Sequence, residues 1–195
     1  MTTTTHTSTL PLAPGRWALD TLHTDVTFAI RHLGLARVRG RFARVEATLD
    51  VGEAPEDVRV EATVYLDSID TGISDRDAHV KEPDFLDVAN RPTMTFTSTR
   101  IIGSGGDWVM EGALAIGDVA RPARFDVEFN GTNAAMGDLR AGFSTSGEIS
   151  RKDYGLSFGT VGDAGLGDVV KFEMDLEFLE PGATGAIRGG EGGGA

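Results

Sequence analysis

Alternating apolar and polar residues run through most of the chain, beginning near Trp17. Val26, Phe28 and Ile30 share one parity, and the residues between them are polar or small. A period of two is typical of a strand with one buried face, because successive side chains point to opposite sides. The run over 170–178 repeats the pattern most cleanly, with an apolar residue at every even position.

These runs predict an all-β protein, because about eight of them occur and most of their connections have hairpin length. No rhythm of strands and long helices appears, which argues against a parallel α/β fold. Two architectures fit the pattern, a β-sandwich and a closed antiparallel barrel of about eight strands. A barrel of that size can hold one small or slender ligand.

Two regions depart from regular alternation. Over 37–51 the apolar residues change parity at 43–44, which predicts one long strand with a β-bulge. Residues 68–92 lose the alternation, and the stretch over about 74–81, followed by Pro83, predicts a short helix. A helix of this length cannot form a layer of its own, so we expect it to lie over one end of a barrel.

The two ends of the chain differ in composition from the middle. Residues 1–14 are rich in threonine and residues 181–195 are rich in glycine, and neither segment shows hydrophobic periodicity. Segments of this kind bury too little apolar surface to fold. We therefore predict a disordered N-terminal tail at 1–14, one domain at 15–180, and a flexible C-terminal tail at 181–195.

Composition and charge narrow the classes of function. The chain has no cysteine, which excludes disulfides and cysteine-ligated zinc. Its formal net charge of −12 argues against non-specific binding to nucleic acid or to anionic lipid surfaces. We expect no transmembrane segment, since no apolar run approaches about 20 residues. Residues 1–15 lack the basic and apolar regions of a secretory signal, so we expect a cytoplasmic protein.

Histidine and carboxylate patterns predict neither a metal site nor a catalytic centre. A zinc site needs three or four clustered ligands, and His-x-His and His-x₃₋₅-His spacings are absent. Asp20 with His23 and Asp77 with His79 would contribute ligands only if the fold brought the two pairs together. Ser144, Thr145 and Ser146 form a polar patch in a strand, with no histidine near them in the sequence. Structural hydrogen bonds near a strand end are the simpler interpretation of His23 and His32.

Arginine is concentrated in one part of the chain. The positions are Arg31, Arg37, Arg39, Arg41 and Arg44. Such a group can bind an anionic head group. In a chain with a large excess of acidic residues, however, we expect most of these arginines to form salt bridges on a solvated strand face.

Three blocks of the chain carry motifs that are more specific than alternation. They are WALDTLHT, VTF, RHL and VRGRF within 17–42, LDSIDTG, RDAHV, DFLDV and PTMTFTS within 66–98, and GEISRKDYGL at 147–156. In order and separation these blocks resemble the signature of YceI-like proteins, which are lipocalin-like barrels that bind polyisoprenoids and related amphipathic lipids. The resemblance implies an eight-stranded antiparallel β-barrel, with the short helical insertion near one end of a pocket.

The resemblance further implies non-catalytic binding of a long-chain lipid, a polyisoprenoid or an isoprenoid quinone-like molecule, inside the barrel. A bound isoprenoid or fatty-acyl lipid would be the only non-protein group. Two alternatives stay open, an enzyme that acts on an apolar isoprenoid-type substrate with His23 or His32 as base, and a packed barrel that binds a protein partner. The resemblance also leaves a homodimer open, since several barrels of the family are dimers.

We expect the ligand to touch apolar side chains on the inward parity of the strands and polar side chains near the mouth. The expected apolar lining is Phe28, Ile30, Phe42, Val64, Phe85, Phe96, Phe125 and Phe172. The expected polar contacts are His23, His32, Arg76 and His79.

Overall fold

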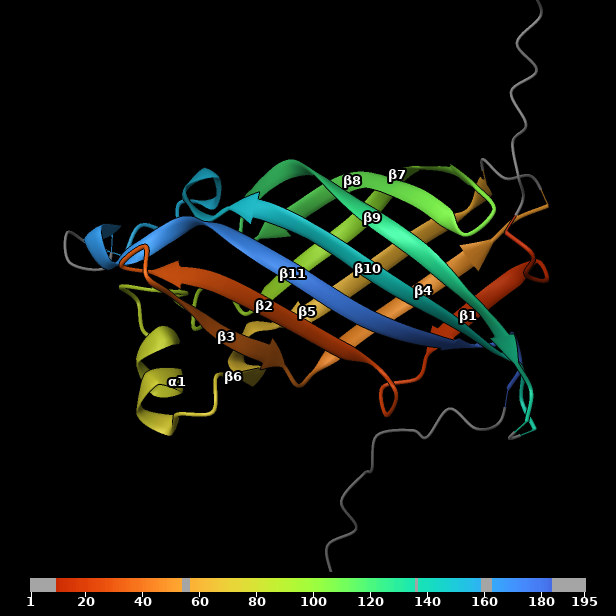
Figure 1. The fold of residues 1–195 in the computed structure, drawn as a ribbon, viewed down its shortest axis with the longest axis horizontal. Coiled ribbons are helices and arrows are strands. Elements are labelled where there is room, and N and C mark those ends of the chain that lie inside the picture. The colour runs from red at the N-terminus through yellow and green to blue at the C-terminus, as the bar shows by residue number, and fades with distance from the viewer. Residues whose placement is uncertain (1–9, 54–56, 136, 159–162, 184–195) are drawn as a thin grey trace, which may run out of the picture.

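The computed structural model describes residues 10–53, 57–135, 137–158 and 163–183. Strands dominate this part of the chain (Figure 1). They are β1 (Gly15–Leu19), β2 (Asp25–His32), β3 (Ala36–Phe42), β4 (Val45–Val51), β5 (Arg59–Tyr65), β6 (Ile69–Asp70), β7 (Thr93–Ser104), β8 (Asp107–Ile116), β9 (Val119–Asn133), β10 (Arg140–Ser150) and β11 (Leu166–Leu179). The helices are α1 (Ser74–Val80) and two 3₁₀ turns, η2 (Leu66–Ser68) and η3 (Arg151–Tyr154). None of the described helices has the length and apolar content that a membrane crossing needs.

The strands form one antiparallel sheet that closes into an eight-stranded barrel, which confirms the predicted fold class. Closure comes from β11, which pairs with β10 on one side and with both β1 and β2 on the other. The eleven strands make eight staves of the barrel, because three staves each consist of two short strands placed end to end. These pairs are β1 with β2, β4 with β3, and β5 with β6. Each of the remaining strands from β7 to β11 pairs with the next one along the chain. Closure satisfies the backbone groups that an open sheet would leave unpaired.

The predicted bulged strand over 37–51 is wrong. The chain leaves the ladder at 43–44, so that β3 pairs with β2 and β6, whereas β4 pairs with β1 and β5. The turn η2 interrupts the neighbouring pair of strands, β5 and β6, beside this break. Ser68 of η2 accepts hydrogen bonds from the backbone amides of Ala43 and Arg44. The parity change therefore marks a corner that two neighbouring strands make together.

Helix α1 confirms the helix predicted over about 74–81 and lies beside β6 at one end of the barrel (Figure 1). The β2–β3 hairpin ends at the same end of the molecule. β6 pairs only with β3 among the described strands, so backbone pairing between strands is least complete beside α1. This end of the barrel is built from loops and short helices rather than from a continuous ladder.

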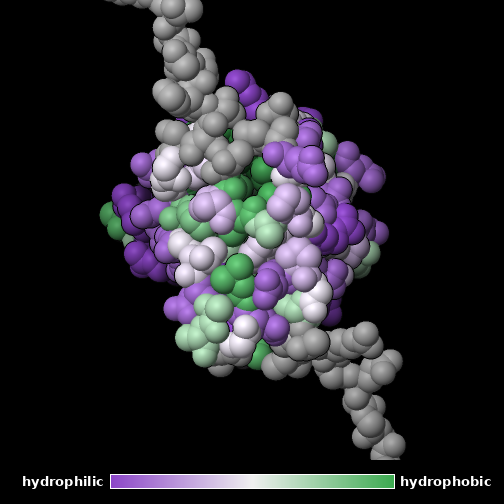
Figure 2. All heavy atoms as spheres, turned by 90° about the vertical axis from the view of Figure 1, so that its right-hand side faces the viewer, coloured by the Kyte–Doolittle hydropathy of each residue, from purple (hydrophilic) through white to green (hydrophobic). Residues whose placement is uncertain are grey.

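The opposite end of the barrel is filled by a separate group of buried side chains. Trp17 and Phe143 are its centre, and Trp17 has no exposed surface. Leu10 and Leu12 are also buried in this group, so the tail predicted at 1–14 is too long. Residues 1–9 and 184–195 of the two predicted tails lie outside the described residues. Figure 2 looks onto this end, where apolar residues gather within a mostly hydrophilic surface.

Candidate functional site

A cavity of about 440 Å³ opens at the end of the barrel that carries α1 and the β2–β3 hairpin. Its walls are mostly apolar and come from β2, β3, β10 and β11, from α1 and from the loops after α1 and η3. A second cavity of about 70 Å³ lies deeper in the barrel. Phe172 and Met94 line both, so their side chains separate the two spaces. The larger cavity has the size of ordinary small-molecule sites, about 300–1,000 Å³.

The structure brings all eight predicted apolar residues to one cavity or the other. Those that line the larger cavity are Phe28, Ile30, Phe42, Phe85 and Phe172. Those that line the smaller, deeper cavity are Val64, Phe96, Phe125 and, again, Phe172. The inward parity of the strands thus identified interior positions, but it did not distinguish the mouth from the depth of the barrel.

Several lining residues were missed by the sequence analysis. Strand residues among them are Val38, Ile149, Leu166 and Val170, and those from the loops and the short helices are Leu66, Val80, Leu86, Leu156 and Phe158. Outside strands no period reports which side chain faces inward. The only sequence signal for these positions was their place inside or beside the motif blocks.

The predicted polar residues divide into two groups. His32, Arg76 and His79 lie at the larger cavity. His23 does not, because the turn between β1 and β2 places it beside Asp20 and Glu177 on a different part of the barrel. The expectation that His23 lies near the same mouth is therefore wrong in position.

On the α1 side of the mouth, Arg76 is held by its own neighbours. Its Nε donates to Thr71 Oγ1 at 2.7 Å and its Nη2 donates to the Thr71 carbonyl at 2.9 Å. Asp77 Oδ1 accepts hydrogen bonds from the backbone amide and the hydroxyl of Thr71. These contacts fix the loop before α1. Arg76 therefore contributes a positioned positive charge to the rim of the cavity.

His79 and two phenylalanines form the neighbouring part of the wall. The His79 ring meets Phe85 edge-on at 4.6 Å between centroids, and Phe85 stacks on Phe158 at 4.7 Å. His79 Nε2 is 3.5 Å from a carboxylate oxygen of Asp84, and both side chains are mostly exposed. The aromatic pair closes this side of the cavity, and the imidazole presents a polar edge at its rim.

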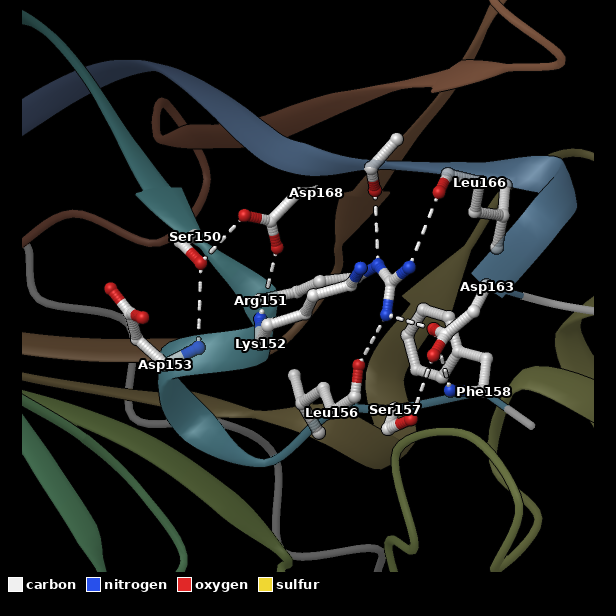
Figure 3. A network of polar contacts seen from close by, with 11 residues as sticks. Ser150, Arg151, Lys152, Asp153, Leu156, Ser157, Phe158, Asp163, Leu166 and Asp168 are labelled. Carbon is white, nitrogen blue, oxygen red and sulfur yellow. Dashed lines mark hydrogen bonds and ion pairs between the residues drawn. The ribbon is translucent and has the colours of Figure 1, made fainter. Parts of the chain in front are cut away.

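Arg151 is fully buried and ties together the wall on the other side of the mouth (Figure 3). Its Nε donates to the Gly167 carbonyl at 3.0 Å, and its Nη2 donates to the Leu166 carbonyl at 3.2 Å. Its Nη1 donates to the Leu156 carbonyl at 2.6 Å and to Asp163 Oδ1 at 2.7 Å. One guanidinium thus joins the segment after η3 to the start of β11.

Asp163 completes this arrangement from the solvent side. Hydrogen bonds from Arg151, from the Ser157 hydroxyl and from the Phe158 amide lower the pKa of Asp163 from 3.8 to about 2. The Arg151 guanidinium also lies 4.5 Å from the centre of the Phe158 ring. This network was not predicted, because Arg151 and Asp163 are twelve residues apart in the sequence and no local pattern indicates that they meet.

The cluster around His23 is the candidate metal site within the described residues. Asp20, His23 and Glu177 each place a ligand atom within 4.8 Å of the others. Arg140 already lies among them, with Nε 2.7 Å from Glu177 Oε1 and Nη2 3.5 Å from Asp20 Oδ2. The guanidinium neutralises the carboxylates that a cation would need, so the arrangement is that of an ion-pair network.

The His23–Asp20 pair makes stability depend on pH. The hydrogen bond and the charge of Asp20 raise the pKa of His23 above 6.5. A raised pKa stabilises the folded state below the unfolded-state value, and that stabilisation is lost as the pH rises through the folded-state value. We therefore expect urea unfolding to show a fall in stability above about pH 6.5. His23→Gln is expected to flatten this fall, and an unchanged slope would contradict the assignment.

Comparison with known proteins gives a consistent result. The family model for the YceI-like domain matches residues 17–178. A UPF0312 protein from Staphylococcus epidermidis is 35% identical over 170 residues, which cover 84% of this chain and 96% of that protein.

Among solved structures, Burkholderia cenocepacia BcnA aligns with a TM-score of 0.73 at 20% identity and covers 82% of this chain and 98% of its own. A polyisoprenoid binding domain from Saccharophagus degradans, implicated in plant cell wall breakdown, aligns with a TM-score of 0.65 at 16% identity. That alignment covers 85% of this chain and 98% of the domain. At these identities the two structures support the fold.

Proposed function

The chain belongs to the YceI-like domain family, and we propose that it binds a long-chain amphipathic lipid non-covalently inside its barrel. The proposed ligand is a polyisoprenoid or an isoprenoid quinone-like molecule, and the proposed role is that of a carrier or store. The observation that carries this proposal is the apolar cavity of about 440 Å³ with a polar rim. The Saccharophagus degradans domain adds support, since a barrel of the same fold is named for polyisoprenoid binding.

The proposal has a simple energetic basis. Each CH₂ group that leaves water for an apolar cavity gains about 0.8 kcal/mol. An isoprenoid chain presents many such groups, so the tail can supply most of the affinity even after the entropy cost of ordering it. Few polar contacts are then needed.

We infer the orientation of the ligand from the two ends of the barrel. The end around Trp17 is filled by side chains, so a tail can enter only from the end that carries α1. The tail would lie along Phe28, Ile30 and Phe42, and a polar head would stay near His32, Arg76 and His79. The deeper cavity beyond Phe172 would receive the end of a longer chain.

A binding role without catalysis is also proposed, on the basis of the histidines. Of the two histidines that line the cavity, His79 has a carboxylate nearby, but its side chain is 61% exposed and its Nε2 is 3.5 Å from Asp84 Oδ2. An exposed, loosely paired imidazole lacks the desolvation and the firm orientation of a catalytic base. Of the two candidate bases, His23 lies away from the cavity and His32 lines it. The His32 side chain makes no hydrogen bond or ion pair with the described residues.

The proposal is tested by two neighbouring valines on β11. Val170 lines the cavity, whereas Val169 is 42% exposed on the outer surface. Native mass spectrometry after incubation with detergent-solubilised farnesol or geranylgeraniol, followed by organic extraction, measures the loaded fraction. Val170→Trp fills the cavity without adding charge, and we expect it to lower loading at least tenfold. Val169→Trp adds the same side chain outside, and we expect loading as in the wild type.

Equal loading of both tryptophan variants would place the ligand elsewhere and would contradict the proposal. Wild-type protein that loads no prenyl alcohol and releases no lipid on extraction would contradict it as well. Thermal unfolding of the two variants serves as the folding control.

A further inference from the structure

The turn between β2 and β3 presents two leucines to solvent at the mouth of the cavity. Leu33 is 58% exposed and Leu35 is 83% exposed. The residue before them, His32, lines the cavity, and the Leu33 amide donates to the Gly165 carbonyl at 2.6 Å. Gly165 lines the cavity too. The leucines therefore stand at the rim, in direct continuity with the cavity wall.

The backbone of this turn makes a leucine unfavourable at position 33. Leu33 has φ of +52° and Gly34 has φ of +69°, and the Leu35 amide donates to the His32 carbonyl at 3.0 Å. Two consecutive positive φ values in a hairpin turn favour Asn or Asp followed by Gly. A bulky side chain at positive φ is strained. The chain thus keeps an apolar side chain, exposed and strained, where asparagine would fit better.

Two other exposed apolar side chains are close in sequence to residues that line the cavity. Ile73 is 53% exposed directly before α1, and Val169 is 42% exposed on β11. Each is close in sequence to a cavity-lining residue, Thr71 and Val170 respectively.

The strands that lead to the tip carry uncompensated positive charge. Arg31 and Arg37 lie directly opposite each other in the β2–β3 ladder, and Arg39 follows next to Ala29. Like charges placed opposite one another destabilise a strand pair. These three arginines form no ion pair or side-chain hydrogen bond within the described ranges 10–53, 57–135, 137–158 and 163–183.

The salt bridges expected for the arginine group form at only two of its positions. Arg41 pairs with Asp70 at 3.2 Å, and Arg44 pairs with Asp67 at 2.8 Å. Both lie further from the tip than Arg31 and Arg37. Among the described residues of a chain with a net charge of −12, three arginines without an ion pair thus lie on the two strands that lead to the exposed leucines.

Acidic side chains occur on the other side of the mouth. Asp75 and Asp84 are exposed there, on or just after α1. A charge acts over about 8 Å at physiological ionic strength, so the sign near the tip is set by the local arginines rather than by the net charge. The asymmetry favours an approach in which the β2–β3 side faces a negative surface.

We propose that the β2–β3 tip docks on a bilayer that carries anionic headgroups. Leu33 and Leu35 enter the interface, and Arg31, Arg37 and Arg39 contact the headgroups, which places the cavity mouth against the membrane. This combination of apolar side chains and adjacent cations is the general chemistry of interfacial anchors. This inference rests on the proposed function, because docking places the mouth for transfer of a lipid between the bilayer and the barrel.

The test is flotation of the full chain with vesicles of phosphatidylcholine, alone or mixed with phosphatidylglycerol. We expect binding to the mixed vesicles only, weakened by salt. Each of Arg31→Gln and Arg37→Gln should weaken binding about 5-fold. Leu33→Asn should weaken it about 10-fold or more while leaving the unfolding temperature unchanged or higher, because asparagine tolerates positive φ. Leu22→Asn, at a leucine 65% exposed in the β1–β2 turn, is the matched control and should bind as the wild type.

A second readout is the fluorescence of a tryptophan introduced at the tip. The two native tryptophans are both buried, so an exposed one can be distinguished from them. Leu35→Trp adds an exposed one, whose emission should shift to shorter wavelength with mixed vesicles, whereas Leu22→Trp should show no shift. Wild-type protein that ignores the mixed vesicles, or Leu33→Asn that binds them equally well, overturns the inference. A self-association that Leu33→Asn abolishes, without vesicle binding, would likewise overturn it and assign the tip to a second copy of the chain. Loading with a detergent-solubilised prenyl alcohol bypasses the bilayer, so it tests the proposed function separately.

Discussion

Replacing Arg151 by methionine is expected to lower the free energy of unfolding by about 3 kcal/mol. The side chain is 1% exposed and donates to three backbone carbonyls and to Asp163. Methionine fills much of the same space but donates nothing, so these acceptors lose the buried donor that they share. In a chain of this size that loss lowers the unfolding temperature by roughly 6–12 °C.

Two further variants distinguish the loss of the hydrogen-bond network from the loss of a positive charge. Arg124→Met removes an arginine whose side chain is 64% exposed, and we expect a change within about 0.5 kcal/mol. Arg151→Lys keeps the positive charge but loses the planar fork of donors, so we expect a clear loss of stability here too. Urea unfolding at neutral pH measures all three. An Arg151→Met variant as stable as the wild type would show that the carbonyls find other donors.

The same network predicts the response to acid. The folded-state pKa of Asp163 is lowered from 3.8 to about 2, so its stabilisation is present above 3.8 and is lost as the pH falls through about 2. Other carboxylates also titrate in this range, and the comparison between variants removes their contribution. The gap in stability between wild type and Arg151→Met should therefore narrow between pH 4 and pH 2.

The contrast between Arg151 and Phe28 shows how far the sequence could predict this site. Phe28 lies in a strand, where parity alone decides which side chains face inward, and the sequence placed it correctly in the barrel interior. Arg151 lies at a 3₁₀ turn, and its partner Asp163 is fixed only by tertiary structure. Local patterns carry no information about such a contact. Barrel walls are therefore predictable from sequence here, and the loops that shape the mouth are not.

The placement of His23 follows the same logic. Parity and motifs put His23 and His32 in one stretch of the chain, but the strand between them, β2, carries them to different places along the barrel. A strand advances about 3.3 Å per residue, so nine residues span most of a barrel's length. Neighbours in sequence are then distant in space, and only the structure assigned His32 to the cavity and His23 to the Asp20 cluster.

Phe172→Ala is expected to lengthen the ligand that the barrel accepts. Phe172 is 5% exposed and lines both cavities, so removing its ring joins the spaces of about 440 Å³ and about 70 Å³. We expect the empty protein to lose about 3 kcal/mol of stability, because the new void is not refilled. A longer prenyl chain can occupy that void, and each further CH₂ that leaves water there gains about 0.8 kcal/mol.

The measurement is the ratio of affinities for geranylgeraniol and farnesol, compared between variants. Phe143→Ala is the matched control, since Phe143 is 6% exposed in the filled end of the barrel and lines neither cavity. Both variants should unfold more easily than the wild type, but only Phe172→Ala should raise the ratio in favour of the longer alcohol. A ratio raised equally in both would reflect general loosening of the barrel. An unchanged ratio in Phe172→Ala would mean that the tail stops before the ring, and the proposed path into the deeper cavity would be wrong.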